Sequence, residues 1–246
     1  MPEESPKSPS RMQAFKMFDR IAHRYDLLNR LLSGGTDVRW RKLMNRRIPE
    51  GNDLCVLDLA TGTADVLIAM ERACPQVSSG IGLDMSGGML KYGQQKLVAL
   101  GLDQKYRLVR GDATALGLDA ERFDAVTISF GIRNVLDVSE GLKEMHRILK
   151  PGGRALILEF SLPANRPFRA CYLFYFRHVL PRLGALISGD TYAYRYLNET
   201  VETFPYGEEF CDLMRDAGFE SVTATPLTFG IASLYQGEKG TASTTA

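Results

Sequence analysis

Apolar residues recur at helical spacing near the start of the chain. Over residues 12–32 they follow one another at intervals of three and four positions, and the run ends in Ser33-Gly34-Gly35, which is typical of an amphipathic helix that stops at glycine. A shorter helix is expected over residues 38–47. We therefore predict a helical cap over residues 12–50, and we expect residues 1–11 to be a disordered lead.

Short apolar runs begin at residue 54 and alternate with helical stretches. Strands are expected at 54–59, 80–84, 107–109, 123–129 and 155–160, with helices at 66–73, 88–100 and 138–149 between them. Strands that alternate with helices at this spacing form right-handed βαβ units, which build a parallel sheet with helices on both faces.

The last part of the chain follows another pattern. After a helix over residues 206–217, two strands are expected at 220–225 and 229–236 with no helix between them, so we predict an antiparallel hairpin at the sheet edge. The whole pattern predicts one α/β domain over residues 12–237, with a mostly parallel seven-stranded sheet, an antiparallel edge strand and N-terminal helices. A flexible tail is expected over residues 238–246.

Composition and charge narrow the classes of function. The chain has 246 residues, with 30 Lys and Arg against 29 Asp and Glu, and this balance argues against a general nucleic-acid-binding protein, which carries a marked basic surplus. Four cysteines without a CxxC pair indicate neither a zinc site nor a disulfide framework. The chain contains no 18-residue apolar stretch of the kind that spans a membrane. We expect a cytoplasmic protein with buried, reduced thiols.

Acidic residues follow each of the first three strands. In an open α/β sheet, ligands bind beyond the carboxyl ends of the strands. Asp58 and Asp65 flank the loop after the first strand, Asp84 ends the second strand, and Asp112 follows the third. A carboxylate in the position of Asp84 can take the two ribose hydroxyls of a bound nucleotide. Both NAD and S-adenosylmethionine (SAM) fit this outline.

Charge decides between these two cofactors. If the loop is read as the dinucleotide motif G-x-G-x-x-G, Asp65 replaces the third glycine at the helix N-terminus, where a pyrophosphate would bind. A carboxylate there repels a dianion, whereas Asp58 and Asp65 would attract the ammonium and sulfonium groups of SAM. Asp112 offers an acceptor to the adenine amino group, with the small Ala113 beside the ring. The sequence therefore favours SAM, although each aspartate taken alone is equally consistent with a helix cap or a turn.

Several motifs resemble one known methyltransferase family. VLDLATGTADV, GLDMS, GDATAL, FDAVTISFGIRN, RILKPGGRALILEFS and TFGIASLYQG resemble the class I SAM-dependent methyltransferases that C-methylate quinol rings. These are the demethylmenaquinol methyltransferases and the 2-methoxy-6-polyprenyl-1,4-benzoquinol methylases of menaquinone and ubiquinone biosynthesis. FDRIAHRYDLLNRLLSGG and YRYLNETVETFP resemble the opening and late signatures of that family. The resemblance implies the Rossmann-like fold of class I methyltransferases over about residues 15–237.

The resemblance also implies the residues that contact SAM. By motif these are Thr63, Asp84, Asp112, Ala113 and Ser129. Ala64 stands where the family loop usually has glycine, so we expect its methyl group to crowd a tight turn. No metal site is expected, because methyl transfer from SAM needs no metal and the three histidines lack metal-ligand spacing.

Methylation of a ring carbon needs an electron-rich carbon. A quinol supplies one when a hydroxyl proton leaves, and ionising a phenol at neutral pH costs about 4 kcal/mol, which a nearby cation offsets in a dry site. Arg133, in the loop after the fourth strand, is the expected catalytic residue, and the resemblance points to the same arginine. Because arginine stays protonated, we assign it phenolate stabilisation, with a structural ion pair as the alternative. Asn134 is expected to donate a supporting hydrogen bond or to shape the turn.

Residues 160–189 contain four arginines and neither Asp nor Glu. Aromatic and aliphatic side chains lie among these arginines, as in a surface helix that touches anionic lipid. Polyprenyl quinols reside in the bilayer, so we expect residues 160–205 to form a substrate-side insertion with peripheral contact to the inner face of the cell membrane. A lid packed inside the protein or in a homodimer is the alternative.

The sequence therefore predicts SAM-dependent C-methylation of a polyprenylated quinol, with demethylmenaquinol as the first substrate and the benzoquinol of ubiquinone synthesis as a further one. No nucleic-acid partner is expected. One alternative is a methyltransferase of a soluble small molecule, against which the SFGIRN motif argues. The other is a non-catalytic scaffold subunit of a quinone-biosynthesis assembly, against which Asp84, Asp112 and Arg133 argue.

Overall fold

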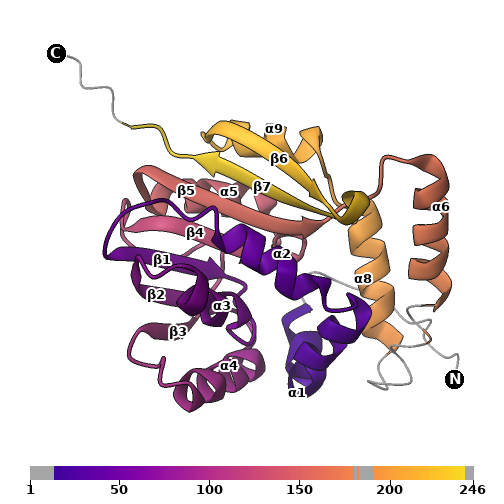
Figure 1. The fold of residues 1–246 in the computed structure, drawn as a ribbon, viewed down its shortest axis with the longest axis horizontal. Coiled ribbons are helices and arrows are strands. Elements are labelled where there is room, and N and C mark those ends of the chain that lie inside the picture. Colours follow the sequence, from indigo (N-terminus) through magenta and orange to yellow (C-terminus); the bar gives the residue numbers. More distant parts are fainter. Residues whose placement is uncertain (1–13, 180–181, 183–190, 242–246) are drawn as a thin grey trace, which may run out of the picture.

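Seven strands form one sheet in the order β3-β2-β1-β4-β5-β7-β6 (Figure 1). The structure is a computed structural model that describes residues 14–179, 182 and 191–241. The strands are β1 (Leu54–Leu59), β2 (Val77–Asp84), β3 (Tyr106–Arg110), β4 (Phe123–Ser129), β5 (Leu149–Phe160), β6 (Glu220–Leu227) and β7 (Ala232–Glu238). Neighbouring strands are parallel except where β7 pairs with β5 and β6. The predicted mostly parallel α/β sheet is confirmed.

The position of the antiparallel strand differs from the sequence-based expectation. β7 lies between β5 and β6, so the edge strand β6 runs parallel to the first five. The two strands of the hairpin differ in burial, since most of β7 is buried and β6 is largely exposed or half-buried. β6 also contains Pro226, which cannot donate a hydrogen bond to the ladder and therefore suits an edge.

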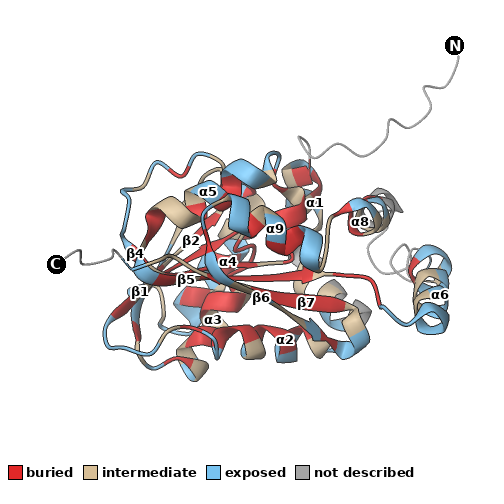
Figure 2. Cartoon of the chain, turned by 90° about the horizontal axis from the view of Figure 1, so that it is seen from above, coloured by how far each residue is buried: buried red, intermediate tan, exposed pale blue. Residues whose placement is uncertain are grey.

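Helices cover both faces of the sheet (Figure 2). Those that pack on it are α2 (Thr36–Asn45), α3 (Asp65–Ala73), α4 (Gly87–Ala99), α5 (Val138–Ile148) and α9 (Glu208–Asp216). Trp40 of α2, Met70 of α3 and Leu97 of α4 belong to the core on one face, and residues of α5 and α9 belong to the core on the other. Val56 joins the first core and Leu57 the second, because successive side chains of a strand point to opposite faces.

Three further helices lie beyond the end of the sheet where the parallel strands finish (Figures 1 and 2). They are α1 (Ala14–Leu32), α6 (Arg166–Phe174), which a π-helical turn continues over Tyr175–Val179, and α8 (Thr191–Thr203). α6 contains no buried residue. The lead expected over residues 1–11 lies outside the described part of the chain. Within that part, no helix is both long and apolar enough to cross a membrane.

Asp19 fastens α1 to the N-terminus of α4. Its Oδ1 accepts hydrogen bonds from the Ser86 hydroxyl at 2.5 Å and from the Gly88 backbone N–H at 2.8 Å. A carboxylate in this position also complements the positive end of the α4 dipole. The approach depends on glycine, because a Cβ at residue 88 would lie 2.9 Å from Oδ1 and 3.2 Å from Cα of Asp19.

The two glycines that open α4 should respond differently to a methyl group. Gly88→Ala should lower the free energy of unfolding by about 1–3 kcal/mol, the usual range for overpacking, because α1 must move away from α4. Gly87→Ala is the matched control, since a Cβ at residue 87 meets nothing within 4 Å and alanine favours the helix. Thermal unfolding of both variants checks this, and equal melting temperatures would contradict the close packing of α1.

Candidate active site

Two cavities meet beyond the carboxyl ends of the strands. The strand-end cavity, of about 290 Å³, lies against the ends of β1, β2 and β4 and the residues that follow β3. The aromatic cavity, of about 450 Å³, lies between α1, α2, α6 and α8. Phe18 and Tyr25 of α1 and Phe130, just after β4, line both cavities. These three side chains therefore form the boundary between them.

Four of the residues predicted to bind SAM line the strand-end cavity, namely Asp84, Asp112, Ala113 and Ser129. Asp84 is held by the backbone, because the N–H groups of Gly62 and Ser86 each donate to its carboxylate at 2.8 Å. Burial raises the pKa of Asp84 despite these bonds. This fixed carboxylate stands at the end of β2, where the ribose of a nucleoside was expected.

Two polar groups of the strand-end cavity are suited to a ligand. The Ser129 hydroxyl is buried and has no hydrogen-bond partner among the described residues, and such a group is usually satisfied by water or a ligand. Asp112 accepts two hydrogen bonds from Thr114, both on Oδ1 at 2.9 Å, which leaves Oδ2 for another donor. The cavity thus offers acceptors for ribose hydroxyls and for an adenine amino group, and its residues fit SAM.

Asp58 lies below the first loop rather than in the cavity wall. Its side chain is fully buried, and the hydroxyls of Thr61 and Thr127 each donate to it at 2.6 Å. Burial raises the pKa of Asp58 to about 7, although both hydrogen bonds oppose this shift. The structure therefore gives Asp58 the task of fixing the loop to β4, and a direct contact with SAM is not supported by its position.

Thr63 and Asp65 also lie outside the lining of the strand-end cavity. Thr63 donates to Asp26 at 2.6 Å. Asp65 forms ion pairs with Lys96 at 2.5 Å, with Arg30 at 3.2 Å and with Arg41 at 3.7 Å. Burial by itself would raise the pKa of Asp65, but these cations outweigh it and the pKa is lowered. The charge expected to attract SAM instead binds α1, α2 and α4 to the start of α3.

Ala64 adopts the left-handed conformation expected of a glycine. Its φ is 65° and its ψ 21°, and its side chain is fully buried. A left-handed alanine costs roughly 1–2 kcal/mol. The methyl group is therefore accommodated, with strain in the turn that leads into α3.

Arg133 lines the aromatic cavity and is also half of a buried ion pair. Its Nη1 donates to Glu159 at 2.6 Å and to the Phe130 carbonyl at 2.8 Å, and the two charged residues are 5% and 1% exposed. The guanidinium carbon lies 5.4 Å from the centre of the Phe160 ring. The catalytic prediction and its structural alternative are therefore compatible, since the pair fixes a cation at the cavity wall.

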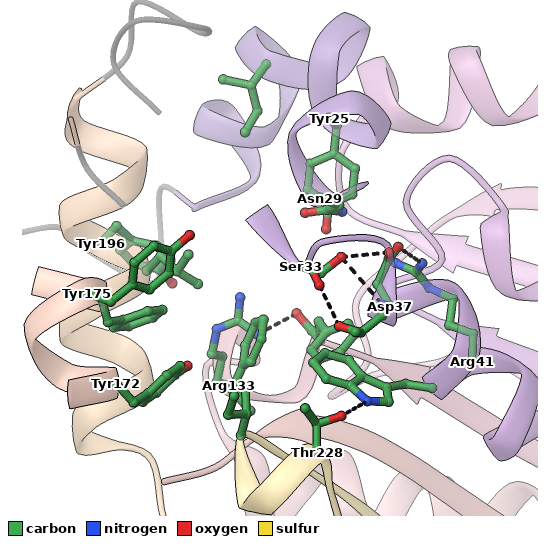
Figure 3. A pocket seen from close by; sticks show the side chains of 18 of the residues that line it. Tyr25, Asn29, Ser33, Asp37, Arg41, Arg133, Tyr172, Tyr175, Tyr196 and Thr228 are labelled. Carbon is green, nitrogen blue, oxygen red and sulfur yellow. Dashed lines mark hydrogen bonds and ion pairs between the residues drawn. The ribbon is translucent and has the colours of Figure 1, made fainter. Parts of the chain in front are cut away.

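Figure 3 shows how the aromatic cavity is built around this arginine. Arg133 lies between two groups of side chains: Tyr172, Tyr175 and Tyr196 on one side, and Tyr25, Asn29, Ser33, Asp37 and Arg41 on the other. Trp40 lines the same cavity, and its Nε1 donates a hydrogen bond to the hydroxyl of Thr228 at 2.9 Å. The exposed wall is mainly apolar, with aromatic rings as its largest component, and polar or charged side chains such as Asp37, Arg41 and Arg133 lie among them.

Asn134 lines the strand-end cavity, one residue from Arg133. Its Oδ1 accepts a hydrogen bond from the Tyr196 hydroxyl at 3.0 Å. This bond ties α8, which lines the aromatic cavity, to the loop that follows β4. The expectation that Asn134 donates to a substrate remains a prediction.

Sequence reasoning missed three parts of this arrangement. Glu159 follows the apolar run of β5. A single acid next to a buried strand indicates that a cation lies nearby in the fold, and this signal could have identified Glu159 as the partner of Arg133. Tyr25 lies on the face of α1 that borders both cavities. The spacing of apolar residues predicts the helix but not which part of the protein this face contacts. Cys171 is exposed and lines the aromatic cavity, so the expectation of buried thiols is wrong for that residue.

The buried carboxyl of Asp58 should make stability depend on pH. Its folded-state pKa of about 7 lies above its ordinary value of 3.8, so it stabilises the fold below about pH 4 and loses this contribution as the pH rises through 7. At roughly 1.4 kcal/mol for each unit, the loss reaches at most about 4 kcal/mol. Asp58→Asn has no proton to lose, so the melting temperature of the native protein should fall relative to this variant between about pH 4 and 7 and change little above pH 7. Parallel melting curves would contradict the shift.

Comparisons with known proteins show the family of the chain. A model of the ubiE/COQ5 methyltransferase family matches residues 8–239. The chain is 47% identical over 224 residues to the ubiquinone/menaquinone biosynthesis C-methyltransferase UbiE of Geobacter sulfurreducens, which covers 91% of this chain and 87% of that protein. It is 45% identical over 223 residues to the demethylmenaquinone methyltransferase of Thermus thermophilus, over 91% of this chain and 100% of that protein.

A solved structure of the CurJ carbon methyltransferase has a TM-score of 0.64 to this chain at 12% identity, over 95% of this chain and 62% of that one. This likeness shows the class I methyltransferase fold alone. The family model and the sequence identity to the two relatives show the family as well as the fold. The chain belongs to the ubiE/COQ5 methyltransferase family, and its methyl donor is S-adenosylmethionine.

Proposed function

We propose that the protein transfers a methyl group from SAM to a ring carbon of a polyprenylated quinol, with demethylmenaquinol as the first candidate. The observation that carries this proposal is the shared boundary of the two cavities. Phe18, Tyr25 and Phe130 line both, so a methyl group in one cavity lies beside a ring in the other. The activities named for the two relatives support the same reaction.

The strand-end cavity would hold the methyl donor. SAM, when bound, supplies a methyl group on a positively charged sulfur. Asp84 would accept hydrogen bonds from the ribose hydroxyls, and Asp112 would accept one from the adenine amino group. Ser129 contributes the buried hydroxyl that lacks a protein partner. These residues orient the donor, and the shared boundary aligns it with the second cavity.

The aromatic cavity would hold the quinol ring. Its volume of about 450 Å³ falls in the range of about 300–1,000 Å³ that small-molecule pockets occupy. The rings of Phe130 and Phe160 lie 4.5 Å apart, and Trp40 lies 5.9 Å from Phe130. Such faces favour a flat, apolar ring. This lining disfavours the alternative of a strongly polar, soluble substrate.

Arg133 would stabilise the phenolate that forms when the quinol loses a hydroxyl proton. Glu159 balances its charge at rest and holds the guanidinium in one orientation, while the remaining N–H groups can donate to the quinol oxygen. A hydrogen bond to a charged group contributes about 1.5–3 kcal/mol, a large part of the roughly 4 kcal/mol that ionising a phenol at neutral pH requires. The negative charge would spread to the ring carbon ortho to this oxygen, and that carbon would bond to the methyl carbon while the methyl–sulfur bond breaks and its electron pair stays on sulfur. Loss of the hydrogen of that ring carbon to water, as a proton, would then restore the aromatic quinol.

Tyr25 is placed to support the same oxygen. It is the one side chain of the cavity boundary with a polar group, since Phe18 and Phe130 have none. Burial raises the pKa of its phenol, so Tyr25 stays protonated and donates a hydrogen bond rather than accepting the proton. The two donors approach the oxygen from different elements, Arg133 from the loop after β4 and Tyr25 from α1.

The reaction itself is tested by incubating the protein with isotopically labelled SAM and each demethylated quinol, naphthoquinol and benzoquinol. We expect mass spectrometry to show one added methyl group on the naphthoquinol ring. Methylation of the benzoquinol as well would show a wider substrate range. Calorimetry with SAM alone tests the scaffold alternative, because a scaffold that binds no SAM would give no heat.

Removing the Arg133 cation should separate chemistry from cofactor binding. Arg133→Gln combined with Glu159→Gln removes both charges, since the single change would leave a buried carboxylate unpaired at a cost of about 3–5 kcal/mol. We expect turnover to fall about 100-fold to 1,000-fold, as for loss of an oxyanion donor. The dissociation constant for SAM should change less than about threefold, because Arg133 lines only the aromatic cavity.

The matched control is Arg154→Gln with Glu238→Gln. This pair joins β5 to β7 at 2.7 Å and lines neither cavity. Its loss should leave turnover near that of the native protein. Native turnover in the Arg133 double variant would refute the role of that arginine in the reaction.

A further inference from the structure

Four aromatic residues are exposed on α6, on the turn that continues it and on the turn between β6 and β7. They are Phe168 and Phe174 of α6, Tyr175 of the π-helical turn, and Phe229 of the turn η4 (Thr228–Gly230) between β6 and β7. Their side chains are 37%, 64%, 36% and 83% exposed in that order. The Phe168 and Phe229 rings meet edge to face with 5.6 Å between their centres. We refer to these four residues as the rim patch.

Phe229 holds its exposed position in an unfavourable backbone conformation. Its φ is 58° and its ψ 21°, the left-handed region that bulky residues rarely adopt. Packing in the protein does not explain a phenylalanine there, because most of the ring faces solvent. Glycine at this position would relieve the strain, so the phenylalanine costs the fold some stability.

The rim patch is continuous with the aromatic cavity. Phe168 and Tyr175 line the cavity and are exposed as well, and Thr228, which precedes Phe229, lines it too. Figure 1 shows α6 and the turn between β6 and β7 at the same end of the molecule. A substrate whose ring enters the cavity therefore passes the rim patch.

The charge around the rim patch is positive. Residues 160–189 contain no Asp or Glu, and Arg166 and Arg169 lie in the first turns of α6. Arg177 is paired with Glu202 of α8, which also lies within electrostatic reach of Arg169, so a single acid faces the three arginines over residues 166–179. Two copies of this patch would repel one another, whereas an anionic surface would attract it.

We infer that the rim patch docks on a bilayer that contains anionic lipid, with Phe229 and Phe174 inserted among the acyl chains and Arg166 and Arg169 at the headgroups. Exposed aromatic groups beside basic residues are the pattern of an interfacial membrane contact. The assignment of a bilayer rests partly on the proposed function, because a long prenyl tail cannot fit in the cavity with its ring and would stay in the membrane.

Flotation with lipid vesicles tests the docking surface. The full-length protein is mixed with vesicles of phosphatidylcholine alone or with phosphatidylglycerol added, without SAM or quinol. We expect binding to the anionic vesicles that weakens as salt is raised. Phe229→Gly should lower the lipid partition coefficient about tenfold, the effect of withdrawing one large apolar side chain, and should not lower the melting temperature because the strain is relieved.

Val98→Ala is the matched control, because Val98 of α4 is 56% exposed and belongs to neither cavity. It should bind vesicles like the native protein. Equal partition of the Phe229→Gly and Val98→Ala variants would overturn the assignment of the rim patch. A dimer in light scattering that Phe229→Gly converts to monomers would also overturn it, in favour of a contact between two copies.

A paired activity measurement separates this inference from the proposed function. Turnover is measured with a short-tailed quinol in solution and with a long-tailed quinol in anionic vesicles. Phe229→Gly should keep the first rate and reduce the second about tenfold, in step with the partition coefficient. Methylation without vesicle binding would refute the docking surface alone, and vesicle binding without methylation of either quinol would refute the proposed function alone.

Discussion

The attachment of α1 to the sheet is the constraint on which both cavities depend. Without α1, the strand-end cavity and the aromatic cavity would each lose a wall and the boundary between them. Asp19 holds the first half of the helix at the start of α4, and Asp26, through Lys96, holds the second half near Asp65. Exposed ion pairs add little to stability, but partly buried ones that share partners in this way fix a helix that has few apolar contacts with the sheet.

The charges of the site are balanced in two different ways. Asp65 is neutralised by three cations at the back of the first loop, whereas Asp84 and Asp112 face the strand-end cavity. Arg133 and Glu159 neutralise each other in the wall of the aromatic cavity. A buried pair of this kind contributes little net stability. Its consequence here is geometric, since it keeps a guanidinium at one place beside an apolar ring.

Local patterns in the sequence were sufficient for the strand–helix alternation and for placing Asp84 and Asp112 beside the strand-end cavity, because each depends on residues close together in the chain. They were insufficient wherever partners lie far apart. Asp65 has the spacing of a cofactor residue, but Lys96 lies 31 positions away and determines its role. Glu159 pairs with Arg133 across 26 positions. The position of β7 between β5 and β6 likewise depends on both strands. The more apolar β7 takes the buried place and β6 the edge, and this comparison cannot be made from either strand alone.

The shared boundary has a consequence for the binding of the two substrates. Phe18 and Tyr25 contribute to both cavities from a single helix, so any displacement of α1 that admits the donor also disturbs the place of the acceptor. Binding of the two substrates is then expected to be coupled, because each ligand fixes the same stretch of α1. A ring analogue in one cavity would then change the dissociation constant for the nucleoside in the other, and the nucleoside would change the affinity for the analogue by the same factor.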